Sequence, residues 1–461
     1  MNNIDRLLGR IKRIHFVGIG GSGMCPLAEI LHKEGYSLSG SDNNETDTLA
    51  RIKGMGIPVF MGHSEANVDG AEMVIYTAAV MQDNPEIVAA KDKNIPLFER
   101  SILLGAVSRR YKNTIGVCGT HGKTTVTSMI TQILLKASLD PSAVIGGKLP
   151  LINANGRAGN SDIFVCEACE FVDTFLQITP SVAVILNIDE DHLDYFGSLE
   201  NIILSFKKFV SQTSETVIVN GDDGNSMKAC EDTRLSVIKF GFGTGNDWYA
   251  ENIVTRKGDC HEFDICRKGE KLTRVLLSVP GRHNVSNALA AAAAAINAGA
   301  DADFVKEGLE SFTGAGRRFE ILAEINNITV ADDYAHHPKE LEVVLTSAMK
   351  MGYNKVWAVF QPFTYSRTSI LFDDFVRVLR IPDKCVMSEI MGAREQNTYD
   401  IYTSQLAEKI EGSVWFNTFE EIADYVVQHA ESGDLILTLG CGDIYKAAKM
   451  IIRNEELGVR N

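Results

Sequence analysis

The sequence predicts an α/β protein with three domains, and three observations support this fold class. The chain has 461 residues, and about 150 residues per domain gives roughly three domains. Short runs rich in β-branched residues alternate with longer helical stretches, a pattern typical of parallel sheets. Apolar residues make up 45% of the chain and charged residues 23%. This composition is ordinary globular usage, and it excludes a disordered or collagen-like chain.

The first domain is predicted over residues 1–110 as a Rossmann-like α/β domain. Its expected strands lie at 13–17, 37–40, 73–77 and 95–97, and its expected helices at 24–33 and 85–93. The second domain is predicted over 111–313 as a P-loop-type α/β domain. Its expected strands lie at 114–118, 163–166, 182–187 and 216–220, followed by a small antiparallel subsheet between 236 and 280 and an alanine-rich helix at 285–298.

The third domain is predicted over residues 314–461 as a second Rossmann-like α/β domain. Its expected strands lie at 328–331, 355–360, 385–388, 413–416 and 435–439, with helices between them. This alternation of strands and helices again indicates an open α/β sheet with parallel strands and crossover helices.

Charge and cysteine usage narrow the function classes. The chain has 45 basic and 60 acidic residues, a net charge of −15. Such a chain is poorly suited to non-specific nucleic-acid binding or to anionic membranes. No apolar run approaches the roughly 18 residues of a membrane helix, and no signal peptide is visible. The nine cysteines do not have the spacing of a disulfide framework, which favours free thiols. We therefore expect a cytoplasmic protein that neither inserts into membranes nor binds nucleic acid.

The first glycine turn lies between a predicted strand and a predicted helix. It reads Gly18-Ile19-Gly20-Gly21-Ser22-Gly23, and Asp42 follows about 20 residues later at the end of the next strand. Glycines permit a tight turn, and a helix N-terminus offers free N–H groups to a diphosphate. The pattern suits NAD, but it reports a diphosphate and a ribose rather than a nicotinamide, so a UDP-sugar fits equally well. A tight packing turn is the structural alternative.

The second glycine turn also joins a strand to a helix. It reads Gly119-Thr120-His121-Gly122-Lys123-Thr124-Thr125. In such a loop backbone N–H groups cradle phosphates, the lysine reaches the β and γ oxygens, and the first threonine is a Mg²⁺ ligand. The strict Walker A pattern fails, because Val117 stands where it requires glycine. Two such turns in successive domains predict an enzyme that activates a nucleotide-linked substrate with ATP.

Other polar residues follow strand ends in the second domain. Glu167 and His192 are candidates for holding Mg²⁺ between ATP and an acceptor carboxylate, although imidazole is an unusual Mg²⁺ ligand. A histidine such as His192, taken alone, is more often structural. For the neighbouring carboxylates we prefer a solvated acidic loop; these are Glu170, Asp189, Glu190 and Asp194. His283, Asn284 and Asn287 lie at the start of the alanine-rich helix, where they either cap it or contact adenine.

The third domain carries its polar motifs at its start and at strand ends. They are Arg317-Arg318-Phe319-Glu320, Asp333-Tyr334-Ala335-His336-His337-Pro338, the Arg367 loop and Gly440-Cys441-Gly442-Asp443. Adjacent arginines suit phosphate and carboxylate binding. Adjacent histidines need not bind a metal, and no third ligand at a suitable spacing is evident.

Together these motifs resemble the Mur ligases over nearly the whole chain. The family's own P-loop variant accounts for the Walker A misfit. The resemblance implies three domains, which bind a UDP-substrate, ATP and an amino acid. It also implies an ATP-dependent ligase of peptidoglycan precursor synthesis that adds L-alanine to UDP-N-acetylmuramate through an acyl phosphate. The nearest alternative is a ligase that joins a preformed murein tripeptide to the same acceptor, and the alternatives from other classes are an NAD-dependent dehydrogenase and a non-catalytic nucleotide sensor.

The resemblance also implies roles for single residues. Lys123, His192, His336 and Arg367 would be catalytic, and Thr124, Glu167 and His192 would surround Mg²⁺. ATP would contact Gly119, Thr120, Gly122, Lys123, Thr124, Thr125, His283, Asn284, Asn287 and Arg318. The UDP-substrate would contact Gly18, Gly20, Gly21, Ser22, Gly23, Asp42 and His121. Three residues depart from the family's usual pattern, namely Phe363, Cys441 and Cys169. The expected oligomeric state is a monomer or a weak homodimer.

Cys25 and Cys118 lie beside the two glycine turns. A helix N-terminus favours the thiolate form, so ligand-protected labelling of both is one expectation. The other is that both thiols are buried and inert.

Overall fold

The structure is a computed structural model, and it describes residues 3–393, 395–456 and 458. The chain divides into two compact units. The first unit holds most residues up to 313 and contains two sheets. The second holds the chain from residue 314 together with 254–261 and 278–284, and contains one sheet. None of the described helices is long and apolar enough to cross a membrane.

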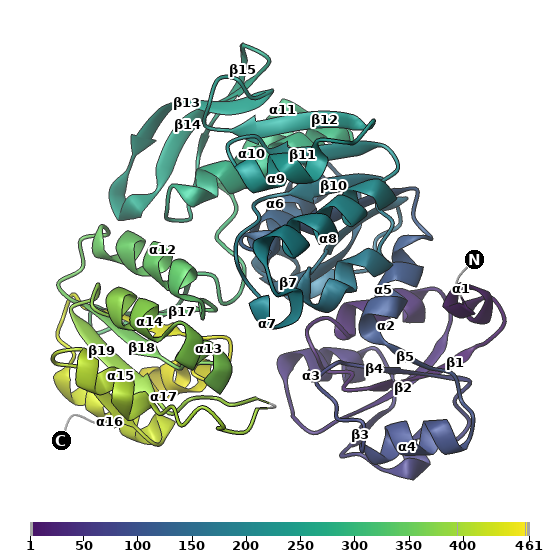
Figure 1. The fold of residues 1–461 in the computed structure, drawn as a ribbon, viewed down its shortest axis with the longest axis horizontal. Coiled ribbons are helices and arrows are strands. Elements are labelled where there is room, and N and C mark those ends of the chain that lie inside the picture. The colour runs from purple at the N-terminus through teal and green to yellow at the C-terminus, as the bar shows by residue number, and fades with distance from the viewer. Residues whose placement is uncertain (1–2, 394, 457, 459–461) are drawn as a thin grey trace. The chain divides into compact units, whose positions relative to one another are not determined.

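The first sheet has the order β3-β2-β1-β4-β5, and its pairs are parallel. Its strands are β1 Arg13–Val17, β2 Ser37–Asp42, β3 Val59–Met61, β4 Met73–Tyr76 and β5 Leu97–Glu99. Its helices are α1 Asn3–Leu8, α2 Cys25–Lys33, α3 Asp47–Gly54, η1 Glu65–Val68, α4 Pro85–Asp92 and α5 Arg100–Ser108. Figure 1 shows α2, α3 and α5 on one face of the sheet and α4 on the other. The strand order reverses between β1 and β4, where open sheets of this kind bind ligands.

The second sheet has ten strands in the order β15-β14-β13-β12-β11-β10-β6-β9-β7-β8. Its parallel centre is made of β6 Asn113–Cys118, β9 Ile163–Glu167, β10 Val182–Ile185, β11 Thr216–Asn220 and β12 Ser236–Gly241. These strands are apolar and mostly buried, as parallel strands covered on both faces must be. The helices are α6 Lys123–Lys136, η3 Phe171–Gln177, α7 Leu193–Phe196, α8 Leu199–Gln212, α9 Gly224–Cys230, α10 His283–Asn297 and α11 Ala302–Glu310.

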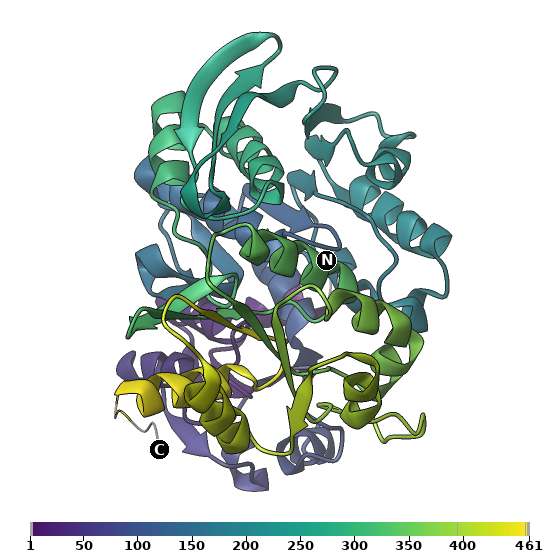
Figure 2. The ribbon, with the colours of Figure 1, turned by 90° about the vertical axis from the view of Figure 1, so that its left-hand side faces the viewer.

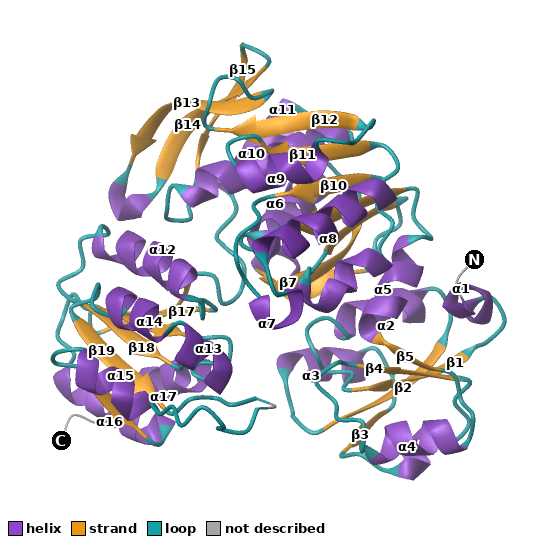
Figure 3. Cartoon of the chain, viewed as in Figure 1, coloured by secondary structure: helices purple, strands orange, loops and turns teal. Residues whose placement is uncertain are grey.

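The predicted antiparallel subsheet is present as an extension of this sheet. β13 Trp248–Thr255 is parallel to β12, whereas β14 His261–Arg267 and β15 Glu270–Leu276 form an antiparallel hairpin. Figure 3 shows these strands continuing the central sheet, and in Figure 2 they are the long teal strands at the top. At the other edge, β7 Ser142–Leu149 is parallel to β9, and β8 Ala154–Arg157 is antiparallel to β7.

The third sheet has the order β16-β17-β21-β18-β19-β20 and is parallel except for β16. Its strands are β16 Glu320–Ile325, β17 Ile328–Asp333, β18 Val356–Phe360, β19 Lys384–Ser388, β20 Val414–Phe416 and β21 Leu435–Leu439. Its helices are α12 Pro338–Met349, α13 Tyr365–Ile370, α14 Phe372–Val378, α15 Thr403–Lys409, α16 Phe419–His429 and α17 Tyr445–Glu456. Separate apolar cores lie on the two faces of this sheet.

The predicted α/β fold class is confirmed, with three sheets and mostly parallel strands. The strand predicted at 95–97 lies two residues later, because Pro96 has no N–H to donate to a neighbouring strand. Four strands were not predicted: the edge strands β3, β8 and β16, and β7, which lies between β9 and β8. The domain boundaries after residues 110 and 313 remain predictions.

Candidate active site

The first glycine turn joins β1 to α2 at the carboxyl end of the first sheet. The N–H of Gly18 donates to the Ser41 carbonyl at 2.8 Å. The N–H of Gly20 donates to Asp42 Oδ2 at 2.9 Å. Gly18 has a φ of +81°, and a Cβ there would lie 2.7 Å from Thr77 Cγ2. Strand β2 therefore fixes the turn, and position 18 requires glycine.

Asp42, the predicted ribose contact, holds the turn itself. Its carboxylate accepts the N–H groups of Gly20 and Asn44, at 2.9 and 3.1 Å. A carboxylate has about four acceptor positions, so these bonds still allow a ribose hydroxyl to bind. Ser22 is exposed at the tip of the turn.

Arg100 is a cation beside this turn that the sequence analysis missed. A Cβ on Gly23 would lie 3.1 Å from Arg100 Nη1, so the guanidinium packs against the turn. Arg100 is the first residue of α5, which follows β5. Its place directly after a parallel strand was the only signal that could have found it.

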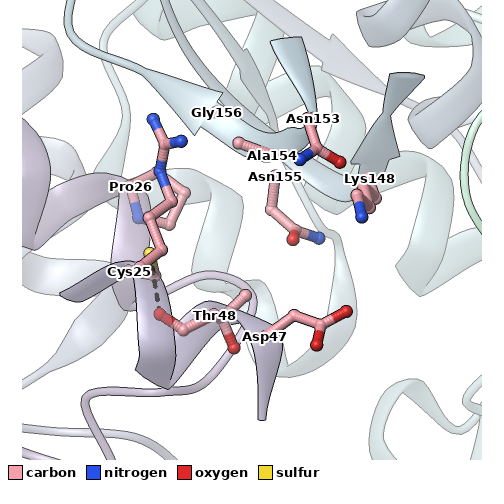
Figure 4. A pocket seen from close by; sticks show the side chains of 10 residues that line it. Cys25, Pro26, Asp47, Thr48, Lys148, Asn153, Ala154, Asn155 and Gly156 are labelled. Carbon is pink, nitrogen blue, oxygen red and sulfur yellow. Dashed lines mark hydrogen bonds between the residues drawn. The ribbon is translucent and has the colours of Figure 1, made fainter. Parts of the chain in front are cut away.

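A cavity of about 310 Å³ lies beside the same turn. Its lining comes from the start of α2, from α3 and from the β7–β8 segment. Thr48 in this lining donates its hydroxyl proton to the Gly20 carbonyl, which joins the cavity wall to the turn. Figure 4 shows the Asn155 side chain pointing toward Thr48 and Asp47. With Arg51 and Lys148 also in its lining, the cavity offers cationic and amide groups to a polar anionic ligand.

The second glycine turn joins β6 to α6 and is held by a neighbouring strand end. The Asn187 side chain makes two bonds to the backbone of His121, accepting its N–H at 2.8 Å and donating to its carbonyl at 3.1 Å. The N–H of Thr120 donates to the Asn187 carbonyl at 3.0 Å. The N–H of Asp189 donates to Thr120 Oγ1 at 2.9 Å. The sequence analysis gave Asn187 no role, yet its side chain holds the loop in place. We call its two bonds to the His121 backbone the Asn187 clasp.

The glycines of the second turn are also required by their surroundings. Gly119 and Gly122 have φ angles of +140° and +86°. A Cβ on Gly122 would lie 2.9 Å from Asn287 Oδ1. The structure therefore brings Asn287, near the start of α10, against this turn.

Lys123, the first residue of α6, is paired with a buried carboxylate. Its Nζ lies 2.9 and 3.1 Å from the two Glu170 oxygens. It also donates to the carbonyls of Gly119 and Thr120, at 2.6 and 3.1 Å. Burial alone would lower the pKa of Lys123, but the Glu170 carboxylate raises it above its usual value.

The prediction of a solvated acidic loop was therefore wrong for Glu170, which is only 3% exposed. Glu190 is exposed as predicted, and Asp189 is half-buried with an oxygen 3.7 Å from His121 Nε2. The Asp194 side chain lies outside the described part of the structure. β6 and β9 are parallel neighbours, so residues that follow β9 face the phosphate loop.

The candidate magnesium ligands are donors at the carboxyl end of the second sheet. Glu167 ends β9, and its Oε1 accepts the Gly146 N–H at 2.6 Å. Thr124 is buried in the first turn of α6. His192 has a φ of +53°, and its ring lies 4.5 Å from that of Phe171. Among the described residues no group of three or more His, Cys, Asp or Glu side chains could hold a metal. A hydroxyl and a carboxylate nevertheless fit Mg²⁺, which commonly takes its other ligands from substrate phosphates and water.

Both thiols beside the glycine turns are buried, which supports the inert alternative. Cys25 is 3% exposed and Cys118 is fully buried. Burial raises the pKa of Cys25 to about 12 and raises that of Cys118 well above its usual value. Neither is a reactive thiolate.

The start of α10 contains residues of both units. His283 and Asn284 belong to the second unit, whereas Asn287 belongs to the first. Asn284 Nδ2 donates to the Pro280 carbonyl at 2.7 Å, so its side chain holds the turn that precedes the helix.

In the second unit, Arg317 is tied into the fold rather than offered to a ligand. Its Nε donates to Asp332 Oδ2 at 2.7 Å, and its other nitrogens donate to the carbonyls of Gly440 and Gly442. The Arg318 guanidinium lies 5.1 Å from the centre of the Tyr334 ring.

His336 and Arg367 follow two strands of the third sheet. His336 Nδ1 lies 3.1 Å from the Tyr334 carbonyl, so the neutral ring carries its proton on Nδ1. Its ring meets that of Phe363 edge to face at 6.2 Å. Burial raises the pKa of Cys441 to about 12, although the nearby positive charge of Arg367 opposes this. β17, β21 and β18 are adjacent parallel strands, so His336, Cys441 and Arg367 follow the same edge of the sheet.

The comparisons with known proteins agree with this arrangement. The UDP-N-acetylmuramate--L-alanine ligase of Acetivibrio thermocellus is 43% identical over 455 residues, which are 97% of this chain and 97% of that protein. The chain belongs to the Mur ligase family. Three family models match it in succession: the Mur ligase family catalytic domain at residues 13–112, the Mur ligase middle domain at 117–295, and the Mur ligase glutamate ligase domain at 317–442.

Solved structures of Mur ligases show the same fold. A UDP-N-acetylmuramate-alanine ligase from Thermotoga maritima matches with a TM-score of 0.84 at 28% identity, over 97% of this chain and all of that one. A murein peptide ligase from Psychrobacter arcticus matches with a TM-score of 0.76 at 24% identity, over 96% and 99% of the two chains. The second match shows the fold alone.

Proposed function

We propose that the chain joins L-alanine to UDP-N-acetylmuramate with ATP, giving ADP, phosphate and the alanyl product. It is a ligase of the Mur family, and full-length relatives at 42–43% identity bear the name of this activity. The structural observation that carries the proposal is the pair of glycine turns in one unit, of which only the second contains a lysine, the half-buried Lys123. One turn suits a nucleotide-linked acceptor, and the other suits the phosphates of ATP.

In this proposal the acceptor binds at the first turn. Gly18, Gly20, Gly21, Ser22 and Gly23 present backbone N–H groups to its diphosphate, Asp42 contacts the ribose, and His121 contacts the same substrate. Arg100 and the adjoining cavity support this placement, because a diphosphate and a sugar both require polar partners.

The second turn binds the phosphates of ATP. Gly119, Thr120, Gly122, Thr124 and Thr125 surround them, and Lys123 neutralises charge that develops as the γ-phosphoryl group moves to the lactyl carboxylate. Thr124, Glu167 and His192 would hold Mg²⁺, which supplies further positive charge beside the phosphate oxygens. His283, Asn284 and Asn287 contact adenine, and Arg318 contacts ATP.

The acyl phosphate is then attacked by the amine of L-alanine. Arg367 binds the alanine carboxylate or the departing phosphate through its planar guanidinium. The Nδ1 of His336 donates to the Tyr334 carbonyl, so Nε2 is the nitrogen that can take a proton from the amine. The monomeric or weakly dimeric state and the cytoplasmic location remain predictions.

Two alternatives are less well supported. An NAD-dependent dehydrogenase does not account for a P-loop or for membership of a ligase family along the whole chain. A tripeptide ligase shares the fold, but the curated relatives that are 42–43% identical over nearly the whole chain are named as L-alanine ligases.

The direct test measures phosphate release with ATP, UDP-N-acetylmuramate and one amine donor at a time. The donors are L-alanine, glycine, L-serine, the other amino acids and the murein tripeptide. We expect release with L-alanine that depends on both co-substrates. Release with the tripeptide alone would establish the alternative ligase, and release without any acceptor would contradict both.

A further inference from the structure

Glu170 is a buried carboxylate to which the proposed reaction gives no task. It follows β9 by three residues and is 3% exposed. Both of its oxygens lie within hydrogen-bond distance of Lys123 Nζ, at 3.1 and 2.9 Å. A buried carboxylate is costly unless it is paired, and in the described structure Lys123 is its ion-pair partner.

Protein oxygens already occupy all the N–H donors of the Lys123 ammonium. An ammonium has three N–H donors. They face four protein oxygens, which are the carbonyls of Gly119 and Thr120 and the two oxygens of Glu170. A phosphate oxygen can therefore bind Lys123 only if one of these bonds is given up. Glu170 is the partner that a phosphate resembles, because both are anions.

We propose that Glu170 is a positioning residue that holds Lys123 in place of a nucleotide phosphate and competes with that phosphate for the ammonium. The proposal rests on the proposed binding of nucleotide phosphates at Lys123. Nucleotide binding then exchanges one anion for another at the same cation. The net gain in free energy is smaller than for a lysine without a counter-charge, so Glu170 keeps nucleotide affinity low.

Glu167, three residues earlier, does not share this role. Its Oε1 accepts the N–H of Gly146, and no ion pair joins it to Lys123 among the described residues. The two carboxylates therefore have different roles: Glu167, which ends β9, is the metal candidate, and Glu170, which follows it, is the ion-pair partner of the lysine.

The test is calorimetric titration of the full chain with ADP in the absence of divalent metal. We compare the wild type, Glu170→Gln, Lys123→Ala and the double variant. Glutamine keeps the shape and one acceptor oxygen but removes the charge. We expect Glu170→Gln to bind metal-free ADP about tenfold more tightly, since a hydrogen bond to a charged group contributes about 1.5 kcal/mol. In the Lys123→Ala background the same change should have no effect.

Glu190→Gln is the matched control, because Glu190 follows β10, the other parallel neighbour of β6, but is exposed. It should leave ADP affinity unchanged, and thermal unfolding should show that all variants remain folded. Unchanged or weaker binding of metal-free ADP by folded Glu170→Gln overturns the inference, and so does tightening that persists without Lys123. If Lys123→Ala itself does not weaken ADP binding, the proposed nucleotide site fails instead.

Discussion

The two glycine turns of the first unit share one local design but differ in their cations. Each joins a buried parallel strand to a helix, and each has a neighbouring strand end that fixes its backbone. At the first turn the side chain of Asp42 holds Gly20, and a cation from a separate helix, Arg100, packs against Gly23. At the second turn Asn187 holds His121, and the cation is Lys123 within the loop itself. A cation from outside the turn is suited to binding a substrate diphosphate. A cation within the loop is placed to stabilise the charge that develops on the transferred phosphoryl group.

The largest expected effect comes from Lys123→Ala, which removes the cation of the second turn. Turnover should fall at least about a hundredfold because stabilisation of transition-state charge is lost. Phosphate release measures this effect, and calorimetry should show unchanged binding of UDP-N-acetylmuramate. Near wild-type turnover would show that Lys123 does not act in the chemical step, and the two turns would then not differ in the role of their cations.

Glu167→Ala and Arg367→Ala should separate the two halves of the reaction. Positional isotope exchange in ATP labelled at the β–γ bridge, without alanine, reports acyl-phosphate formation. Exchange should be much weaker in Glu167→Ala, because the metal site beside the second turn loses an anionic ligand. It should be at least partly retained in Arg367→Ala. Full exchange in Glu167→Ala would refute the metal assignment.

Arg100→Ala is the counterpart of Lys123→Ala at the first turn. We expect the KM for UDP-N-acetylmuramate to rise about tenfold, the size of one charge-assisted hydrogen bond, while kcat stays within about twofold. Initial-rate kinetics with each substrate varied give both values. A collapse of kcat like that of Lys123→Ala would mean that both turns take part in the chemistry.

Asn187→Ala removes the clasp of the second turn without touching its lysine. The KM for ATP should rise about fivefold, because loss of the two bonds that hold the His121 backbone costs the loop about 1 kcal/mol of phosphate-binding free energy in total. Asn225→Ala is a suitable control, since Asn225 Nδ2 makes a single bond to the Ile188 carbonyl nearby. An equal rise of the KM for ATP in the two variants would show that the bonds of Asn187 to His121 have no specific role in ATP binding.

Gly18→Ala and Gly35→Ala give the smallest expected effects. Both glycines have positive φ, at +81° and +86°, but only a Cβ at position 18 would meet another atom within 4 Å. Both variants should lose about 1 kcal/mol of stability from backbone strain, and Gly18→Ala should lose more, because its Cβ would also overlap Thr77 Cγ2. Only Gly18→Ala should also weaken binding of the UDP-substrate. Chemical denaturation and calorimetry measure the two quantities, and equal binding by both variants would contradict a close-packed turn.

The sequence predicted what depends on local pattern and missed what depends on distant neighbours. The strands at 216–220 and 435–439 lie where the runs of β-branched and leucine residues place them. β7 was missed because Gly146 and Gly147 resemble a turn. Gly146 instead lies within the strand, and its N–H donates to the Glu167 carboxylate. β16 was missed because its Glu, Leu and Ala residues favour a helix.

In the candidate site, too, the sequence predicted local features and missed contacts between distant residues. Glycine spacing and the lysine identify both turns, because these features are local. Which of several nearby carboxylates is buried is decided by a contact across 47 residues, between Lys123 and Glu170. The clasp by Asn187 spans 66 residues. An asparagine after a strand has no pattern that separates a clasp from a loop residue.

The Asn187 clasp has a consequence for protein engineering. The segment 119–125 could be transplanted onto another strand–helix junction, since its seven residues are contiguous. A recipient that lacked an asparagine at the end of the adjacent parallel strand would leave the His121 peptide groups to bond with water. The smallest transferable unit is therefore the pair of strands β6 and β10 with both of their following loops. Grafts of the loop alone should lose nucleotide affinity even where every residue of the motif is copied.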